Sequence, residues 1–257
     1  MFDIFLPCAP KDFNKLPFCV NAIGKYIKEF DKIYICVPKD IPADIKNKIK
    51  VKYKLVYDSE VLPIDRNDWK FRPNWLFQQH VKLFQEITQD WYLTIDSDII
   101  VNREMKFFEK NKPIYYMGQD QFFCPYFIFQ TLMIGLPKVN DHTYVADMNL
   151  IYRPIINEIL ERNGYNRMSF IKKSQEITDK WCCMGEPELY GSYVKKYYPN
   201  MYIERKLKQY PYGGRPQKNI NELKWNENEI KEMMEKTKNI DVDVLSIHSW
   251  LDEGDQK

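Results

Sequence analysis

Residues 91–98 of this 257-residue chain, Trp-Tyr-Leu-Thr-Ile-Asp-Ser-Asp, are the most informative part of the sequence about its fold. Five residues suited to a buried strand, 91–95, run directly into two carboxylates separated by one serine. In an extended chain residues i and i+2 point the same way, so Asp96 and Asp98 can face one common ligand. Like charges at an apolar strand end repel each other unless a cation or a helix N-terminus offsets them. We therefore interpret this stretch as a strand that ends in a site for a hard divalent cation, with an exposed Asp-Ser-Asp turn as the alternative.

Strands and helices alternate on the N-terminal side of this stretch. Apolar runs that end at proline predict strands, and apolar residues at helical spacing predict helices that pack on a sheet. We expect strands at 2–7, 33–37, 51–57 and 91–95, and helices at 16–30, 41–49 and 74–87. Asn74 is the expected cap of the third helix, and His80 on its apolar face is expected to be core. The alternation predicts an α/β fold with a mixed, mostly parallel sheet and helices on both faces.

The pattern after residue 112 is less regular. We expect strands at 114–118, 127–135, 201–205 and 242–247, and helices at 152–162, 186–197 and 227–238. No internal repeat and no low-complexity linker interrupts the chain. In open parallel sheets ligands bind outside the carboxyl ends of the strands, so Asp96 and Asp98 stand where a ligand is expected.

The amino-acid composition mainly excludes certain classes of protein. Hydrophobic residues make up 44% and charged residues 29%, and the net charge of +2 argues against a dedicated nucleic-acid binder. No apolar run is long enough for a membrane span, because the longest, 122–136, contains Pro125 and Gly135. Six cysteines without paired spacing indicate free thiols, and the first residues lack a signal-peptide pattern. We expect a cytoplasmic protein without a transmembrane segment and without stable nucleic-acid binding; peripheral contact with the inner membrane face is the alternative.

Motifs elsewhere in the chain make the pattern more specific. They are Leu-Pro at 6–7 followed by Asp12, Arg-Pro-Asn-Trp-Leu-Phe-Gln-Gln at 72–79 with Lys82, Leu-Thr-Ile-Asp-Ser-Asp at 93–98, Glu-Pro-Glu-Leu-Tyr-Gly at 186–191, and His248. With these motifs the chain resembles the GT-A fold nucleotide-sugar glycosyltransferases and is similar to the DUF6492-type glycosyltransferase family. The resemblance spans most of the chain and implies a GT-A (Rossmann-like) sheet in a single domain, 1–257. It implies a nucleotide-binding half at 1–112 and an acceptor-binding half at 113–257.

The resemblance also implies a metal site and a catalytic base. Mn²⁺ or Mg²⁺ would be bound by Asp98, by Asp96 directly or through water, and by His248, although a lone histidine is often purely structural. An acidic general base is expected in the second half of the chain. The candidates are Glu186 first, Glu188 second, and Asp147 on the acceptor side.

Other roles for these acids stay open. Acids at a helix N-terminus also complement the helix dipole, so Glu186 and Glu188 can be structural. A retaining enzyme would need none of the three acids as a base, and the sequence does not distinguish inverting from retaining transfer.

Donor contacts are expected on three segments: the turn after the first strand, the helix that follows residue 72, and the basic loop 205–218. The expected donor-binding residues are Pro7, Lys11, Asp12, Arg72, Gln79, Lys82, Asp96, Ser97 and Arg215. A flexible basic loop can close over a diphosphate and exclude water. The alternative for the basic side chains is a solvated surface role.

The implied activity is metal-dependent transfer of a hexosyl or related sugar. The donor would be a UDP- or GDP-type nucleoside diphosphate-sugar, and the acceptor a hydroxyl of a glycan, a glycoprotein or a modified base. A nucleotidyltransferase acting on a sugar phosphate is the first alternative, although no glycine-rich phosphate loop follows the first strand. A haloacid-dehalogenase-like phosphatase would carry Asp-x-Asp after its first strand, and here the motif lies too deep in the chain. A non-catalytic carbohydrate-binding protein on the same fold is the last alternative.

Overall fold

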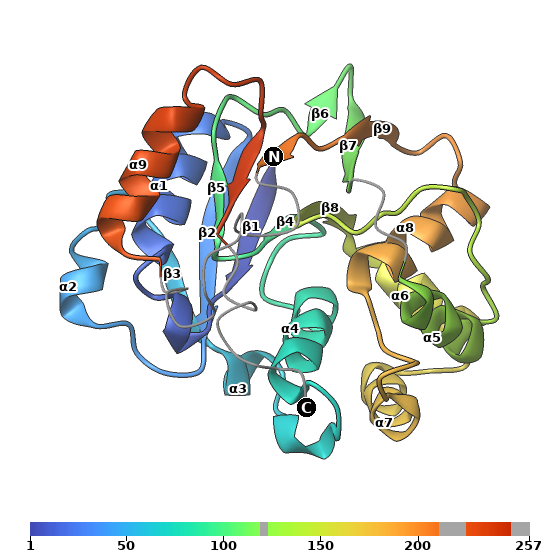
Figure 1. Cartoon of the computed structure of the whole chain (residues 1–257). Helices are drawn as coiled ribbons and strands as arrows, with labels where there is room; N and C mark the ends of the chain where they lie inside the picture. The colour runs from blue at the N-terminus through green and yellow to red at the C-terminus, as the bar shows by residue number, and fades with distance from the viewer. Residues whose placement is uncertain (119–122, 211–224, 248–257) are drawn as a thin grey trace.

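The centre of the molecule is a five-stranded sheet, seen in a computed structural model that describes residues 1–118, 123–210 and 225–247. The strand order is β3-β2-β1-β4-β8. The strands are β1 (Phe2–Pro7), β2 (Phe30–Val37), β3 (Lys54–Tyr57), β4 (Trp91–Ile95) and β8 (Met148–Tyr152). The first four are parallel, and β8 runs antiparallel beside β4 (Figure 1).

Helices cover both faces of this sheet. They are η1 (Pro10–Asp12), α1 (Leu16–Tyr26), α2 (Ala43–Lys46), α3 (Asp58–Val61), η2 (Arg66–Asp68), α4 (Pro73–Phe84), α5 (Cys124–Ile134), α6 (Arg153–Arg162), α7 (Arg167–Ile177), α8 (Glu186–Tyr197) and α9 (Glu227–Thr237). Figure 1 shows α1 and α9 on one side of the sheet and α4, α6 and α8 on the other. Because side chains alternate along a strand, Ile4 and Leu6 join the core on the α1 side, whereas Phe5 joins the core that includes Leu76 of α4. The expected fold class, a mixed and mostly parallel α/β sheet with helices on both faces, is confirmed.

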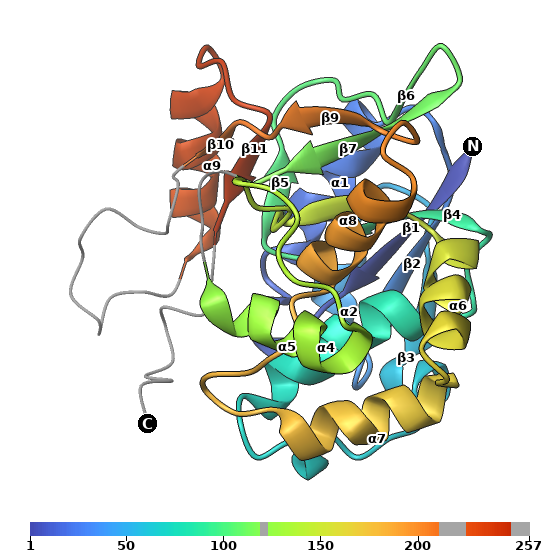
Figure 2. The ribbon, with the colours of Figure 1, turned by 90° about the vertical axis from the view of Figure 1, so that its right-hand side faces the viewer.

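Two small sheets extend the structure beyond the central one. Their strands are β5 (Ile99–Val101), β6 (Phe108–Glu109), β7 (Lys112–Met117), β9 (Ile203–Lys206), β10 (Gln209–Tyr210) and β11 (Val244–Ser246). One sheet has the order β10-β11-β5 and the other β6-β7-β9, and Figure 2 shows β7 and β9 side by side. Because β11 runs antiparallel to β5, the end of β11 returns to the start of β5, where Ile247 N donates to Asp98 O over 2.8 Å.

Two local predictions are wrong. Residues 127–135 do not form a strand, because residues up to 134 belong to α5 and Gly135 ends that helix at φ 62°. An apolar run without clear periodicity does not distinguish a strand from a buried helix. Asn74 does not cap α4, because Arg72 is the N-cap and Pro73 begins the helix. The strand β8 and the helix α7 correspond to no predicted element.

Membrane-spanning helices and disulfides are both absent from the described residues. No helix within them is long and apolar enough to cross a membrane. All six cysteines are free thiols, and five of them are buried.

Candidate active site

The Asp96–Asp98 turn lies at the carboxyl edge of the parallel strands, between β4 and β5. Backbone hydrogen bonds hold it from both sides: Asp96 N donates to Asp147 O over 3.1 Å, and Asp98 O accepts from Ile247 N. Ser97 is buried, whereas the two aspartates are half-buried. The turn is therefore fixed by segments that come much later in the chain, and its two carboxylates stay near the surface.

Lys82 connects the acidic turn to the start of α8. Its Nζ lies 2.7 Å from Asp96 Oδ1 and 2.8 Å from Glu186 Oε1. Gln78, one turn earlier on the same face of α4, donates to the same Asp96 oxygen over 2.9 Å. The Lys82 side chain is only 4% exposed. A solvated surface role for this lysine is therefore wrong, because it is the buried centre of an ion triad.

The cluster carries more negative than positive charge. Burial raises the pKa of Asp96 to about 7; Lys82 opposes the shift, while Asp98, Asp147 and Glu186 add to it. Burial also raises the pKa of Glu186, again against the effect of Lys82. Burial alone would lower the pKa of Lys82, but Asp96 and Glu186 outweigh it and raise that pKa above its ordinary value. Three carboxylates thus raise the pKa of Asp96 against one lysine that lowers it, an arrangement that an additional cation would stabilise.

The described residues supply only part of a metal-ligand set. Within 1–118, 123–210 and 225–247, no group of three or more His, Cys, Asp or Glu side chains is arranged to hold a metal ion. Two expected site residues, His248 and Arg215, lie outside these ranges. Asp96 and Asp98 provide hard carboxylate oxygens of the kind that Mg²⁺ and Mn²⁺ prefer, so the donor chemistry fits such an ion.

Within the part of the chain that the structure describes, Glu186 has one carboxylate oxygen without a hydrogen-bond partner. Its Oε1 binds Lys82, whereas its Oε2 is buried and unpaired. Gln79 Oε1 accepts from the Glu186 backbone N over 3.4 Å and so fixes the start of α8 against α4. Leaving a buried acceptor unsatisfied is costly, so Oε2 is suited to receive a donor group from a ligand.

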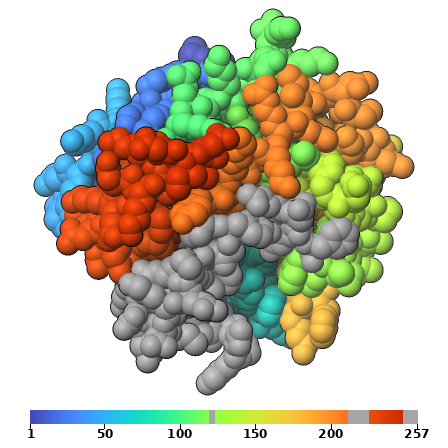
Figure 3. All heavy atoms as spheres, turned by 45° about the horizontal axis from the view of Figure 1, so that its top comes forward, coloured from blue at the N-terminus to red at the C-terminus, as the bar shows by residue number. Residues whose placement is uncertain are grey.

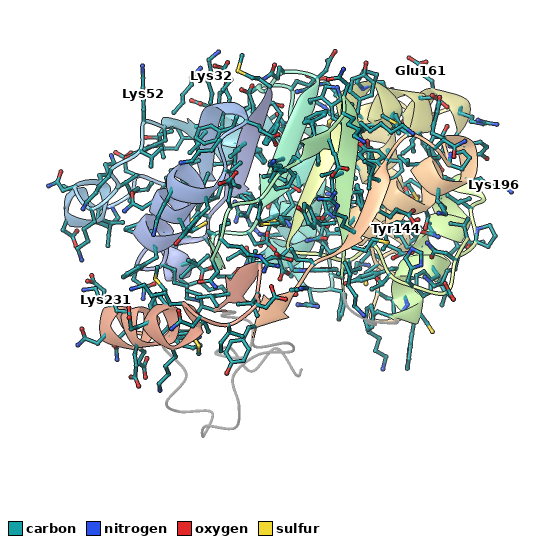
Figure 4. The ribbon with its side chains drawn as sticks, turned by 90° about the horizontal axis from the view of Figure 1, so that it is seen from above. Lys32, Lys52, Tyr144, Glu161, Lys196 and Lys231 are labelled. Carbon is teal, nitrogen blue, oxygen red and sulfur yellow. The ribbon has the colours of Figure 1, made fainter. Side chains whose placement is uncertain are left out.

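Glu188 lies in a different environment from Glu186. It is fully buried and accepts hydrogen bonds from Thr143 Oγ1 (3.1 Å), Tyr144 N (2.9 Å) and Ser192 Oγ (3.1 Å). Figure 4 shows Tyr144 among the elements of the second half, where its hydroxyl donates to Glu204 of β9 over 2.9 Å. Glu188 therefore anchors the loop that contains Tyr144 to α8.

Asp147 joins the acidic turn to the small sheet. Its Oδ2 accepts from Gln209 Nε2 of β10 and, over 3.4 Å, from Ser246 Oγ of β11. Its backbone oxygen accepts from Asp96 N, as described above. The side chain therefore lies close to Asp96, as its effect on the Asp96 pKa also indicates.

The residues after β1 include a contact that the sequence does not reveal. Pro7 ends β1, Lys11 is exposed in η1, and Asp12 is buried. Lys15 is 2% exposed; its Nζ lies 2.9 Å from Asp12 Oδ1 and donates to Ile247 O over 2.7 Å. The turn after β1 and the end of β11 are thus joined by one buried lysine. A lone lysine at the start of a helix gives no sequence signal that it joins two distant segments. Gln78, the other contact that was not predicted, could have been found from its i, i+4 spacing to Lys82.

Arg72 lies at the opposite end of α4 from Lys82. It is the N-cap residue, with φ 41° and ψ 55°, and its guanidinium carbon is 4.5 Å from the centre of the Trp75 ring. Trp75 in turn stacks on Tyr126 of α5, with ring centres 6.0 Å apart. Arg72 therefore belongs to an aromatic stack between α4 and α5, while Gln79 and Lys82 contact the start of α8.

A family comparison agrees with the resemblance inferred from the motifs. Residues 4–120 match the family model of DUF6492, which is described as a family of unknown function. The expected similarity to DUF6492 is therefore confirmed over this range, which contains the 72–82 segment and the Asp96–Asp98 turn. No curated protein matches the chain.

Three solved structures with a similar chain path are named as glycosyltransferases. Mouse xyloside xylosyltransferase 1 in its apo form has a TM-score of 0.48 at 9% identity, over 95% of this chain and 97% of that one. The apo-form glycosyltransferase GlyE of Streptococcus pneumoniae TIGR4 has 0.46 at 13% identity, over 97% of this chain and 55% of that one. The galactosyltransferase LgtC, in complex with donor and acceptor sugar analogs, has 0.44 at 9% identity, over 95% and 86%. At TM-scores below 0.5 these likenesses carry no argument about this chain.

Proposed function

We propose that this chain is a metal-dependent glycosyltransferase that moves a sugar from a nucleoside diphosphate-sugar to a hydroxyl acceptor. The proposal depends on one observation: the acidic turn at the carboxyl edge of the sheet lies beside a buried Lys82–Glu186 pair with an unsatisfied carboxylate oxygen. This edge is where α/β sheets bind ligands. The motif resemblance to GT-A enzymes supports the same reading.

The proposed cation is Mn²⁺ or Mg²⁺, with Asp98, Asp96 and His248 as its protein ligands. When bound, such an ion neutralises charge on the leaving diphosphate. The excess of carboxylates around Asp96, which raises its pKa to about 7, supports a cation at this place. Pro7, Lys11, Asp12, Ser97 and Arg215 are the proposed further contacts to the donor.

Glu186 is assigned the acceptor side of the reaction, and Lys82, a donor contact expected from the sequence, lies between it and Asp96. The Lys82 charge lowers the pKa of both Asp96 and Glu186 against the effect of burial, so it favours their ionised forms. Glu186 Oε2, which has no other partner, is the proposed acceptor of the hydroxyl proton. Glu188 and Asp147, whose carboxylates already accept hydrogen bonds from the protein, stay the lesser candidates for the base.

The test is a screen of UDP- and GDP-sugars against the purified chain, with Mn²⁺ and with chelator. A donor that binds should raise the unfolding temperature only with metal, and should then release nucleoside diphosphate in the presence of an acceptor mixture. Asp98→Asn should abolish both responses. Asp44→Asn removes the same charge from an exposed position on α2 and should change neither.

Three results would contradict the proposal. Full turnover by the Asp98→Asn variant, or unchanged turnover in chelator, would remove the metal from the mechanism. Release of pyrophosphate would identify a nucleotidyltransferase. Absence of any response to every nucleotide, with and without metal, would favour a carbohydrate-binding protein.

A further inference from the structure

Within the described residues, Arg72 has no hydrogen-bond or ion-pair partner for its charge. It is half-buried, its Nε is buried without a hydrogen bond, and within the described residues its guanidinium makes no ion pair. The other half-buried arginines of this part of the chain all bind a carboxylate or a carbonyl: Arg66, Arg103, Arg153, Arg167 and Arg205. Removing charge from water without a partner costs free energy, so Arg72 is suited to an anion that comes from outside the chain.

The fold holds this arginine in a fixed position. Its guanidinium stacks on Trp75, a cation–π contact, and Trp75 lies nearly parallel to Tyr126, with 18° between the rings. Tyr126 packs so closely on Gly185 that an added Cβ there would stand 2.9 Å from the ring. The left-handed backbone of Arg72, at φ 41°, is an unfavourable conformation for a residue other than glycine. The side chain is therefore oriented before any ligand arrives.

The position of Arg72 separates it from the expected diphosphate. Arg72, Trp75, Gln79 and Lys82 follow one face of α4 at spacings of three and four residues. A helix rises 1.5 Å per residue, so Arg72 lies about 15 Å from Lys82 along the axis, farther than one diphosphate group spans. Gln79, which contacts Glu186, is seven residues from Arg72, so the two lie about 10 Å apart along the helix axis. This distance corresponds to one or two sugar rings.

The neighbours of Arg72 come from the half of the chain that is expected to bind the acceptor. Tyr126 belongs to α5 and Gly185 precedes α8, and Figure 2 shows α5 alongside α4. In the space-filling view, the teal segment that includes α4 reaches the surface beside the green segment that includes α5 (Figure 3). Arg72 is itself partly exposed, and it lies at the opposite end of α4 from Lys82, which contacts the acidic turn.

We propose that Arg72 binds an anionic group, a carboxylate or a phosphate, that is carried by the acceptor one or two sugar rings away from the reacting hydroxyl. This rests on the proposed function and assigns Arg72 to the acceptor, in place of the donor contact expected from the sequence. A guanidinium presents two parallel N–H groups that match a carboxylate or phosphate. The substrate class is therefore an acidic glycan or a glycosyl phosphate.

The test measures binding by calorimetry without metal, nucleotide or turnover. The probes are glucuronate and glucose 6-phosphate, each compared with glucose. The wild-type chain should bind both acidic sugars about tenfold or more tightly than glucose, because charge-assisted hydrogen bonds are the strong ones. Arg72→Gln should lose this preference, and Arg72→Lys, which keeps the charge but not the planar fork, should keep part of it. Lys70→Gln removes the same charge two residues away, at an exposed position, and should change nothing.

A second arm distinguishes acceptor from donor. UDP and GDP are titrated with Mn²⁺ into the wild-type and Arg72→Gln chains, and their affinities should be equal. A nucleotide affinity that falls as much as the acidic-sugar affinity would place Arg72 on the donor and overturn the proposal. Equal binding of acidic and neutral sugars, or no binding of either acidic sugar, would also overturn it. The sugar titrations measure binding without catalysis. They therefore test the role of Arg72 even if the chain does not transfer sugars.

Discussion

At the scale of single residues, Lys82 determines whether Asp96 and Glu186 can stay charged together. Both carboxylates contact the same Nζ, and both have raised pKa values because of burial. Removing one partner of a buried ion pair leaves an uncompensated charge, which is far more costly than replacing the whole pair. The lysine is therefore as much a part of the site as the aspartates of the turn.

Lys82→Met should lower the free energy of unfolding by about 3 kcal/mol. The double variant Lys82→Met/Glu186→Gln should be more stable than the single one, because it no longer holds a carboxylate without a cation. Urea unfolding at neutral pH measures both differences. Lys236→Met, at a lysine with 69% exposure, is the control and should leave the free energy of unfolding unchanged. A Lys82→Met chain as stable as the wild type would contradict the buried triad.

His80 shows the opposite case, a titratable group held neutral. It is fully buried, with Nδ1 2.8 Å from Leu76 O and Nε2 2.9 Å from Ser174 Oγ. The Nδ1–H therefore donates to the carbonyl, and Nε2 accepts from the serine hydroxyl. Burial lowers the pKa of His80 to about 4, which confirms the expectation that this histidine is core.

This shift predicts a pH-dependent contribution to stability. Below the ordinary pKa of 6.5 the unfolded chain binds a proton that the folded chain does not accept until about pH 4. The His80 contribution is therefore fully present above pH 6.5 and falls as the pH drops from 6.5 to about 4, by up to about 3 kcal/mol. Unfolding free energies of wild type and His80→Asn across this range check it. The stability difference between them should shrink toward low pH, and a constant difference would refute the assignment.

At the scale of elements, periodic segments could be predicted and exceptions to periodicity could not. The strands β1, β2 and β4 and the helices α1, α6, α8 and α9 lie where alternation or helical spacing places them. The helix α5 was misread because its residues are apolar on nearly every side, so only Pro125 and Gly135 mark its ends. The prediction of Asn74 as the N-cap of α4 is wrong, because Arg72 takes that position in a left-handed conformation with its guanidinium over the Trp75 ring. Residue preferences for capping do not include such a contact.

The strained start of α4 gives a prediction about conformation alone. Arg72→Gly and Arg72→Ala both remove the guanidinium, so their difference reports the cost of φ 41° for a residue with a Cβ. The glycine variant should be the more stable of the two by about 1 kcal/mol, since a left-handed conformation costs other residues about 1–2 kcal/mol. Thermal or urea unfolding measures the difference. At a position in an ordinary helix the order would be reversed, so an alanine variant of greater stability would contradict the observed backbone.

At the scale of the whole molecule, the site is assembled from contacts that sequence spacing cannot reveal. Asp96, Asp98 and Glu186 could be selected from motifs, but the link from Asp96 to Glu186 runs through Lys82, which is 104 positions from Glu186. Lys15 and Ile247, 232 positions apart, carry no motif at all. Motifs identify side chains with the right chemistry, whereas the fold decides which of them meet.

Lys15→Met should therefore loosen the end of β11 more than the central sheet. The variant loses the bond to Ile247 O and the ion pair with Asp12. Hydrogen exchange should become faster for peptides that contain residues 244–247, with little change for β1. Lys28→Met removes an exposed lysine at the end of α1 and serves as the control. Equal exchange of β11 in wild type and Lys15→Met would show that other contacts hold this strand.

The return of β11 to the acidic turn also has a consequence for synthesis of the chain. Asp96 and Asp98 leave the ribosome long before Ile247, whose amide closes the turn and whose carbonyl binds Lys15. A nascent chain that has completed the Asp96–Asp98 turn already contains Lys82 but still lacks Glu186, Asp147 and the last strand. The lysine then has no second carboxylate to bind, and the turn lacks its backbone partners Asp147 and Ile247. Competence to bind substrate would then appear late in translation, and a ribosome stalled before residue 247 would display an incomplete site.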